Sequence, residues 1–116
     1  MPHLIIDYSD NLGSSIQELK ILEALHDVML NCGLFSPDAV KSRSYNAQDF
    51  LVGTKGNSGS FLHVSVAILS GRTVEQKQTL SQALINILQE KLIDVDSLTV
   101  EIRELDRETY KKVTAS

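Results

Sequence analysis

The run Phe61–Leu69 constrains the fold of this chain more than any other stretch of the sequence. Side chains alternate between the two faces of a strand, and one face here carries only aliphatic residues: Leu62, Val64, Val66 and Ile68. The opposite face is also largely apolar, with His63 and Ser65 as its polar members. Strands that are apolar on both faces are typical of the middle of a sheet. We therefore expect Phe61–Leu69 to be a central strand covered on both sides.

Helical periodicity precedes this strand. Ser14 and Ser15 can each cap a helix, because Gln17 and Glu18 follow three residues later in the position of a capping-box partner. Gly33 can adopt the left-handed conformation found just past many helix ends. Between them, apolar residues recur at roughly helical spacing: Ile16, Leu19, Ala24, Leu25, Val28 and Met29. The pattern predicts one helix that ends at Gly33.

A second helix is predicted after the turn Ser70–Gly71–Arg72. Thr73 is its expected cap, with Gln76 as the capping-box partner. Apolar residues then recur at helical spacing along one side of the helix, and the aliphatic part of Lys91 covers the end of this apolar stripe. The stripe consists of Leu80, Ala83, Leu84, Ile87, Leu88 and Lys91. We expect this stripe to pack on the sheet.

Three other segments are predicted to be strands. Residues 3–8 form a short apolar and aromatic run closed by turn formers, residues 40–50 have a weaker strand pattern, and residues 98–103 alternate between apolar and polar. The segment Gly53–Gly59 is rich in turn formers and predicts a hairpin loop. Its lysine precedes the second glycine, so its spacing does not match that of a phosphate-binding loop.

The resulting order is strand, helix, strand, strand, helix, strand, which corresponds to two βαβ units joined through a hairpin. We expect a single α+β domain over residues 1–116, with a four-stranded mixed sheet and two helices on one face. The other face would be bare, and a largely apolar bare face needs a partner. Cyclic self-association is the simplest cover, and it would naturally place a substrate site between subunits.

The composition disfavours several partners and locations. Of the 116 residues, 42% are hydrophobic and 22% are charged, and no segment approaches the roughly 20 continuous apolar residues of a membrane span. Eleven Lys and Arg residues against fifteen Asp and Glu residues give a net charge of −4, which disfavours binding to nucleic acid. We therefore expect neither a membrane nor a nucleic-acid partner.

The cysteine and histidine residues give two further expectations. The single Cys32 cannot form an internal disulfide, and the N-terminal residues do not resemble a signal peptide, so a cytoplasmic location is expected. His3, His26 and His63 lie far apart in sequence and lack the spacing of metal ligands, so no metal site is predicted.

The start of the chain contains a candidate catalytic group. Pro2 becomes a free secondary amine if Met1 is removed, and the apolar run Leu4–Ile6 directly after it would fix that amine in the body of the fold. The alternative is a terminal residue without a chemical role, which frays with the end of the chain.

Several motifs, in order and over nearly the whole chain, resemble the tautomerase superfamily and most closely the 5-carboxymethyl-2-hydroxymuconate Δ-isomerases. They are Pro2-His3-Leu4-Ile5, Ser9-Asp10-Asn11, Lys41-Ser42-Arg43, Phe61-Leu62-His63-Val64 and Ser70-Gly71-Arg72-Thr73, the last followed by Glu75 and Gln78. The residues Tyr45-Asn46-Ala47 depart from the aromatic neighbours expected after Arg43, which leaves the particular substrate open.

The resemblance implies a homotrimer without a cofactor. Its N-terminal proline, Pro2 here, would be the general base that moves a proton in an unsaturated 2-hydroxy or 2-oxo dicarboxylate from aromatic catabolism. Arg43 and Arg72 would bind the substrate carboxylates or stabilise the dienolate. These roles agree with elementary chemistry, because burial and nearby cations lower the pKa of an amine toward neutral pH, and a guanidinium matches a carboxylate in two places.

Other interpretations remain open. Arg72 could be a surface turn residue, and His63 is expected to be a hydrogen-bonded structural or interface histidine rather than a catalyst. A related proline-dependent activity, such as haloacrylate dehalogenation, would need a water-activating acid near Pro2, for which Asp7 and Glu101 are the strand candidates. A third possibility is an oligomeric binding protein without enzymatic activity.

Overall fold

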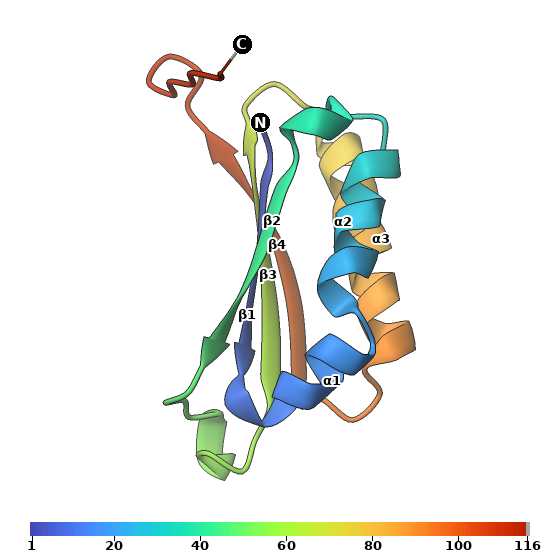
Figure 1. Ribbon diagram of the computed structural model, residues 1–116, viewed down its shortest axis with the longest axis vertical. Helices are drawn as coiled ribbons and strands as arrows, with labels where there is room; N and C mark the ends of the chain where they lie inside the picture. The colour runs from blue at the N-terminus through green and yellow to red at the C-terminus, as the bar shows by residue number, and fades with distance from the viewer. Residues whose placement is uncertain (116) are drawn as a thin grey trace.

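Four strands form one mixed sheet in the order β2-β1-β3-β4 (Figure 1). The computed structural model describes residues 1–115. The strands are β1 (His3–Ser9), β2 (Lys41–Ala47), β3 (Phe61–Leu69) and β4 (Ser97–Leu105). β1 runs parallel to β2 and antiparallel to β3, and β3 runs parallel to β4. The predicted α+β architecture of two βαβ units is confirmed, and the apolar run Phe61–Leu69 is a central strand as expected.

The α-helices all lie on one face of this sheet (Figure 1). The α-helices are α1 (Gly13–Glu18), α2 (Ile21–Asn31) and α3 (Val74–Lys91). Three short 3-10 turns accompany them at Asp10–Leu12, Pro37–Ala39 and Gly53–Lys55. Of the helices in residues 1–115, none combines the length and the apolar character needed to cross a membrane.

The prediction of one continuous helix up to Gly33 is wrong, because the chain breaks between α1 and α2. Lys20 adopts a left-handed conformation with φ 51°, and no serine side chain caps α1, whose N-cap is Leu12. The break has a packing reason. Ile16 and Ile21 are both buried, yet in a continuous helix residues five apart point about 140° away from each other. The left-handed conformation of Lys20 changes the direction of the chain, so that the side chains of Ile16 and Ile21 both point into the core.

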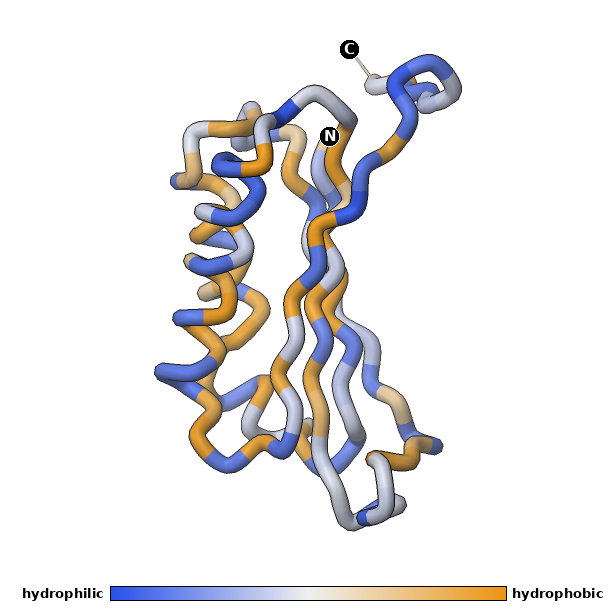
Figure 2. Tube along the Cα trace, turned by 180° about the vertical axis from the view of Figure 1, so that it is seen from behind, coloured by the Kyte–Doolittle hydropathy of each residue, from blue (hydrophilic) through white to orange (hydrophobic). Residues whose placement is uncertain are grey.

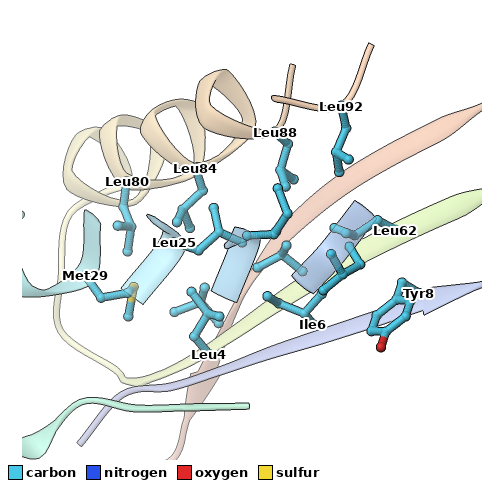
Figure 3. Close-up of a cluster of buried hydrophobic side chains, with 14 of the residues drawn as sticks. Leu4, Ile6, Tyr8, Leu25, Met29, Leu62, Leu80, Leu84, Leu88 and Leu92 are labelled. Carbon is cyan, nitrogen blue, oxygen red and sulfur yellow. The ribbon is translucent and has the colours of Figure 1, made fainter. Parts of the chain in front are cut away.

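The second predicted helix is confirmed in detail. The hydroxyl of Thr73 accepts a hydrogen bond from the backbone N–H of Gln76, whose side chain accepts one from the N–H of Thr73, completing the capping box. Figure 3 shows helix and strand side chains pointing into one shared core. The fully or nearly fully buried members of that core include Leu4, Ile6, Leu25, Met29, Leu62, Val64, Val66, Ile68, Leu80, Leu84 and Leu88.

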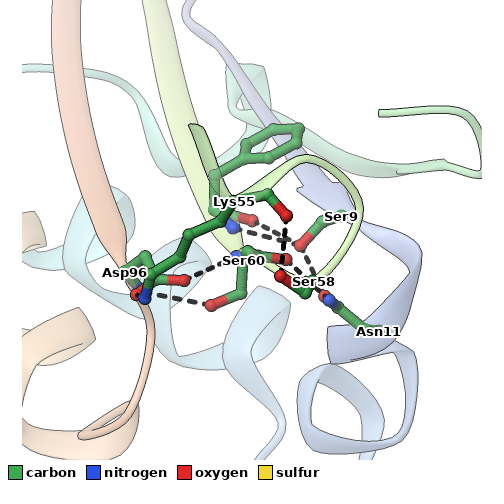
Figure 4. A network of polar contacts seen from close by, with 8 residues as sticks. Ser9, Asn11, Lys55, Ser58, Ser60 and Asp96 are labelled. Atoms are coloured by element: carbon green, nitrogen blue, oxygen red, sulfur yellow. Dashed lines mark hydrogen bonds and ion pairs between the residues drawn. The ribbon is translucent and has the colours of Figure 1, made fainter. Parts of the chain in front are cut away.

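The segment between β2 and β3 is a loop as predicted, but it does not close a hairpin. β1 lies between β2 and β3 in the sheet, so the loop crosses the end of β1. A polar network fixes its end (Figure 4). Asp96 Oδ2 accepts from the N–H of Ser60 at 2.9 Å, the N–H of Asp96 donates to Ser60 Oγ at 3.0 Å, and Lys55 Nζ pairs with Asp96 Oδ1 at 2.5 Å. These bonds join the beginnings of β3 and β4.

The three α-helices within residues 1–115 leave the second face of the sheet uncovered. We call this the open face. Figure 2 shows from behind that the α-helices lie on the opposite side of the strands. The register places these odd-numbered positions of β1, β3 and β4 and their β2 partners on the open face: His3, Ile5, Asp7, Lys41, Arg43, Tyr45, His63, Ser65, Ala67, Thr99, Glu101 and Arg103. Within one chain β3 is therefore covered on one side only, contrary to the expectation, because both crossover helices pack on the same face.

Candidate active site

Pro2 lies at the entry to β1, in the body of the fold. Its side chain is fully buried, and its carbonyl oxygen accepts a hydrogen bond from the N–H of Lys41 at 3.1 Å. Because β2 runs parallel to β1, this bond ties the start of the chain to the start of β2. The alternative of a fraying terminal residue does not fit this packing. With Met1 attached, the Pro2 nitrogen is an amide and cannot accept a proton.

The terminal amine lies in surroundings that disfavour a positive charge. Burial lowers the pKa of the Met1 amine from its ordinary value, and the cations of Lys112, Lys41 and Arg72 lower it further. The nitrogen of Pro2 follows one residue inward, and consecutive Cα atoms are about 3.8 Å apart. A proline amine exposed by removal of Met1 would therefore form within the same cationic neighbourhood.

Arg72 is held in place at the turn between β3 and α3. Its Nη2 donates to the carbonyl of Leu34 at 2.8 Å, its Nη1 to the carbonyl of Leu69 at 3.4 Å, and its guanidinium lies 5.1 Å from the ring centroid of Phe35. Gly71 allows the turn because it adopts φ 123°, which is rare for other residues. These contacts do not match those of a free surface residue, and they leave other guanidinium donors available.

Arg43 lies on the open face of β2, half-buried beside His3. A guanidinium has only donors, so Arg43 Nη1 donates to His3 Nδ1, at 3.3 Å. Burial, followed by the charges of Arg43, Lys41 and the chain terminus, lowers the pKa of His3. The charge of Arg72 therefore acts on the terminal amine, whereas Arg43 is connected to this end of the sheet through His3.

The sequence analysis assigned no role to the segment after β4, which packs near the candidate site. Arg107 Nε donates to the carbonyl of Ser70 at 2.5 Å, next to the turn that carries Arg72. The hydroxyl of Tyr110 lies 3.3 Å from His3 Nε2, and Lys112 contributes to the lowered pKa of the Met1 amine. The one signal of this segment in the sequence is its cluster of charged residues. Charge alone does not indicate where a tail packs, so these contacts could not be predicted.

The acidic candidates for water activation do not lie beside Pro2 within the chain. Asp7 is five residues farther along β1, roughly 16 Å away at the usual rise of a strand. Glu101 shares its register with Ser65, the partner of Ile5, which is roughly 10 Å along the strand from Pro2. Neither Asp7 nor Glu101 therefore lies beside the proline nitrogen of its own chain.

His63 has hydrogen-bond partners on both ring nitrogens. Nδ1 lies 2.6 Å from Thr99 Oγ1 and Nε2 lies 2.5 Å from Glu101 Oε2, while Arg103 Nε is 3.6 Å from the other oxygen of Glu101. This agrees with the predicted structural or interface role. Within residues 1–115, no three His, Cys, Asp or Glu side chains form a group that could hold a metal ion.

A groove of about 570 Å³ lies elsewhere, between α2 and α3. It is lined mainly by apolar atoms, and Cys32, Asn31 and Glu75 are among its lining residues. The groove contains none of Pro2, Arg43 and Arg72, so the catalytic candidates lie outside it.

Solved structures share this fold. The chain is 24% identical to a 5-carboxymethyl-2-hydroxymuconate isomerase from Deinococcus radiodurans R1, with a TM-score of 0.85 over 98% of this chain and 90% of that one. A 5-carboxymethyl-2-hydroxymuconate delta-isomerase is 23% identical, with a TM-score of 0.80 over 99% and 89% of the two chains. A fused 4-OT wild type symmetric trimer is 23% identical, with a TM-score of 0.71 over 90% and 86%.

Family membership rests on the sequence itself. Among curated proteins, none matches the chain. The model of the family described as 5-carboxymethyl-2-hydroxymuconate isomerase matches residues 2–115, so the matched region begins at Pro2. The chain is therefore an isomerase that belongs to the 5-carboxymethyl-2-hydroxymuconate isomerase family, within the tautomerase superfamily.

Proposed function

We propose that this protein, once Met1 is removed, moves a proton in an unsaturated 2-hydroxy or 2-oxo dicarboxylate of the 5-carboxymethyl-2-hydroxymuconate type, with Pro2 as the general base and no cofactor. The observation that carries the proposal is the environment of the chain's start. Burial and three cations lower the pKa of the terminal amine there. A base with a lowered pKa is neutral and able to accept a proton near pH 7.

In this mechanism the neutral amine of Pro2 removes a proton from the substrate, either from the 2-hydroxyl group of a dienol or from a carbon conjugated with a 2-oxo group. The electron pair of the broken O–H or C–H bond stays in the conjugated system as a dienolate, with negative charge on the oxygen. The protonated proline then gives the proton to a different atom, a carbon of the system, which restores the neutral amine and moves the double bond. The proton that leaves the substrate is the proton that returns, so no cofactor is required.

Arg72 and Arg43 have complementary roles in this proposal. Arg72 is fixed by backbone carbonyls and by Phe35, so its positive charge needs little reorganisation to stabilise the dienolate oxygen or a carboxylate next to Pro2. Arg43 retains donors beyond the one directed at His3 and can bind a substrate carboxylate in two places.

We further propose that the protein is a homotrimer whose substrate site lies at a subunit interface. The open face is a continuous surface of half-buried and exposed side chains, and a second and third copy would cover it. The solved fused 4-OT structure of the same fold is described as a symmetric trimer. Arg43, which lies on the open face, could then serve the proline of its own chain or of a neighbour. We expect the enzyme to act in the cytoplasm.

The proposal is tested with untagged protein whose loss of Met1 is verified by intact mass. Wild type should ketonise a 2-hydroxymuconate-type dienol, and Pro2→Ala should lose at least about 100-fold in kcat/KM, the scale expected for a lost general base. Equal rates for the two proteins would refute the role of Pro2. A mass that shows complete retention of Met1 in active protein would refute it as well.

A further inference from the structure

The segment after β4 folds back onto the end of the sheet where the candidate site lies. Asp106 begins a hydrogen-bonded turn, because its carbonyl accepts from the N–H of Thr109 at 3.2 Å and of Tyr110 at 3.0 Å. Its side chain accepts from the N–H of Glu108 at 2.9 Å. The turn directs the half-buried ring of Tyr110 toward β1, where its hydroxyl lies 3.3 Å from His3 Nε2.

The hydrogen bonds around His3 have a fixed direction. Arg43 can only donate, so His3 Nδ1 must be the acceptor and cannot carry a proton. In a neutral imidazole the proton is then on Nε2, which donates to the hydroxyl of Tyr110. Arg43 therefore determines the tautomer of His3, and the hydroxyl of Tyr110 accepts from Nε2–H and holds the ring in place with Nδ1 toward Arg43. A different tautomer, or a protonated ring, would present an N–H to the guanidinium.

The contacts from Tyr110 to His3 and from His3 to Arg43 restrict the rotamers that the Arg43 side chain can adopt. A long arginine side chain on an exposed sheet face samples many rotamers, and binding a carboxylate must restrict them. The bond to His3 engages Nη1 and leaves the remaining donors of the guanidinium free. An arginine already fixed on one side loses less conformational freedom when a carboxylate binds on the other.

We propose that Tyr110 is a positioning residue for the substrate-carboxylate site: through His3 it holds Arg43 in the orientation that binds a carboxylate. The inference rests on the proposed role of Arg43 and extends it to the C-terminal segment. Tyr110 acts through His3: its hydroxyl holds the imidazole in place, and His3 sets the orientation of Arg43.

The test compares Tyr110→Phe with Thr109→Val in protein verified to lack Met1. Each variant removes one oxygen atom from adjacent residues of the same turn, but only the tyrosine hydroxyl contacts His3. Tyr110→Phe should raise KM for the dienol dicarboxylate by about threefold to tenfold with kcat nearly unchanged, the effect of one lost hydrogen bond. Thr109→Val should match wild type. Equal KM values for wild type and Tyr110→Phe would overturn the proposal.

A double-mutant cycle separates positioning from a general structural role. If Tyr110 acts through His3, Tyr110→Phe should change nothing further in a His3→Ala background. Additive effects of the two substitutions would overturn the proposed relay. Nitrogen-15 NMR of wild type should show the proton of His3 on Nε2, and a proton on Nδ1 would overturn the relay.

A binding measurement keeps this inference distinct from the catalytic one. Calorimetry with adipate, an unreactive six-carbon dicarboxylate, reports on the carboxylate site whether or not turnover occurs. Adipate should bind wild type about threefold to tenfold more tightly than Tyr110→Phe. Protein that lacks isomerase activity but shows this difference would refute the proposed reaction and retain the positioning role. Equal adipate affinity for both proteins, or no binding to wild type, would overturn the positioning role.

Discussion

At the scale of single residues, two readouts of one substitution can separate two effects of Arg72. We propose that its guanidinium binds a substrate oxygen, and its charge helps to lower the pKa of the terminal amine. We expect Arg72→Ala to reduce kcat/KM by roughly 100-fold, the scale of one lost donor to a developing oxyanion, and to move the rising limb of the pH–rate profile to higher pH. Kinetics across pH 5–9 would measure both.

Lys91→Ala is the matched control for Arg72→Ala. It also removes one cation, but from the end of α3 that lies at the opposite end of the molecule from the N-terminus (Figure 1). Its pH–rate profile should coincide with that of wild type. A profile of Arg72→Ala that falls in amplitude without moving along the pH axis would contradict the electrostatic effect of Arg72 on the amine.

His3 gives a prediction for stability against pH. Burial and neighbouring cations lower its pKa below the ordinary 6.5, so the unfolded chain binds this proton more readily than the folded one. The contribution of His3 to the free energy of unfolding should therefore fall as pH drops through 6.5, and it should become constant below the pKa of His3 in the folded state. Urea unfolding midpoints of wild type and His3→Gln should diverge between pH 7.5 and 5.5, with the variant losing less. Parallel midpoints would contradict this account.

At the scale of elements, Asp96 is expected to fasten the beginnings of β3 and β4. Its pKa is lowered chiefly by the hydrogen bond from Lys55 and then by the N–H of Ser60, so its contribution exists above the ordinary aspartate pKa and is lost as pH falls. Asp96→Asn should lower the thermal midpoint at pH 7 and approach wild type near pH 3. The exposed Asp94→Asn is the control, and an equal loss in both variants would count against a specific clamp.

The elements also show what the sequence can and cannot predict. The capping box of Thr73 and Gln76 and the alternation in Phe61–Leu69 are local signals, and both structures form as expected. The left-handed Lys20 is not visible locally, because it follows from the need of Ile16 and Ile21 to reach one core. Tyr110 contacts His3 across 107 positions of sequence, and no local pattern encodes such a contact.

At the scale of the whole molecule, the open face should be the assembly surface. Ile5 lies at its centre, between Arg43 of β2 and Ser65 of β3. Sedimentation velocity should show wild type as a trimer and Ile5→Glu as a smaller species, because a buried unpaired carboxylate is costly. Ile93→Glu changes a residue that is 82% exposed outside the open face and should remain trimeric. A monomeric wild type would contradict the proposed assembly.

The central claim is that the amine of Pro2, exposed by removal of Met1, is the base. The most direct measurement is a pH titration of that nitrogen by nitrogen-15 NMR, run beside the pH dependence of kcat/KM on the same processed protein. The Pro2 amine should have a pKa below the ordinary terminal-amine value of about 8, and this pKa should coincide with the midpoint of the rising limb. An amine that titrates at or above this value, or a rate profile independent of its titration, would contradict it.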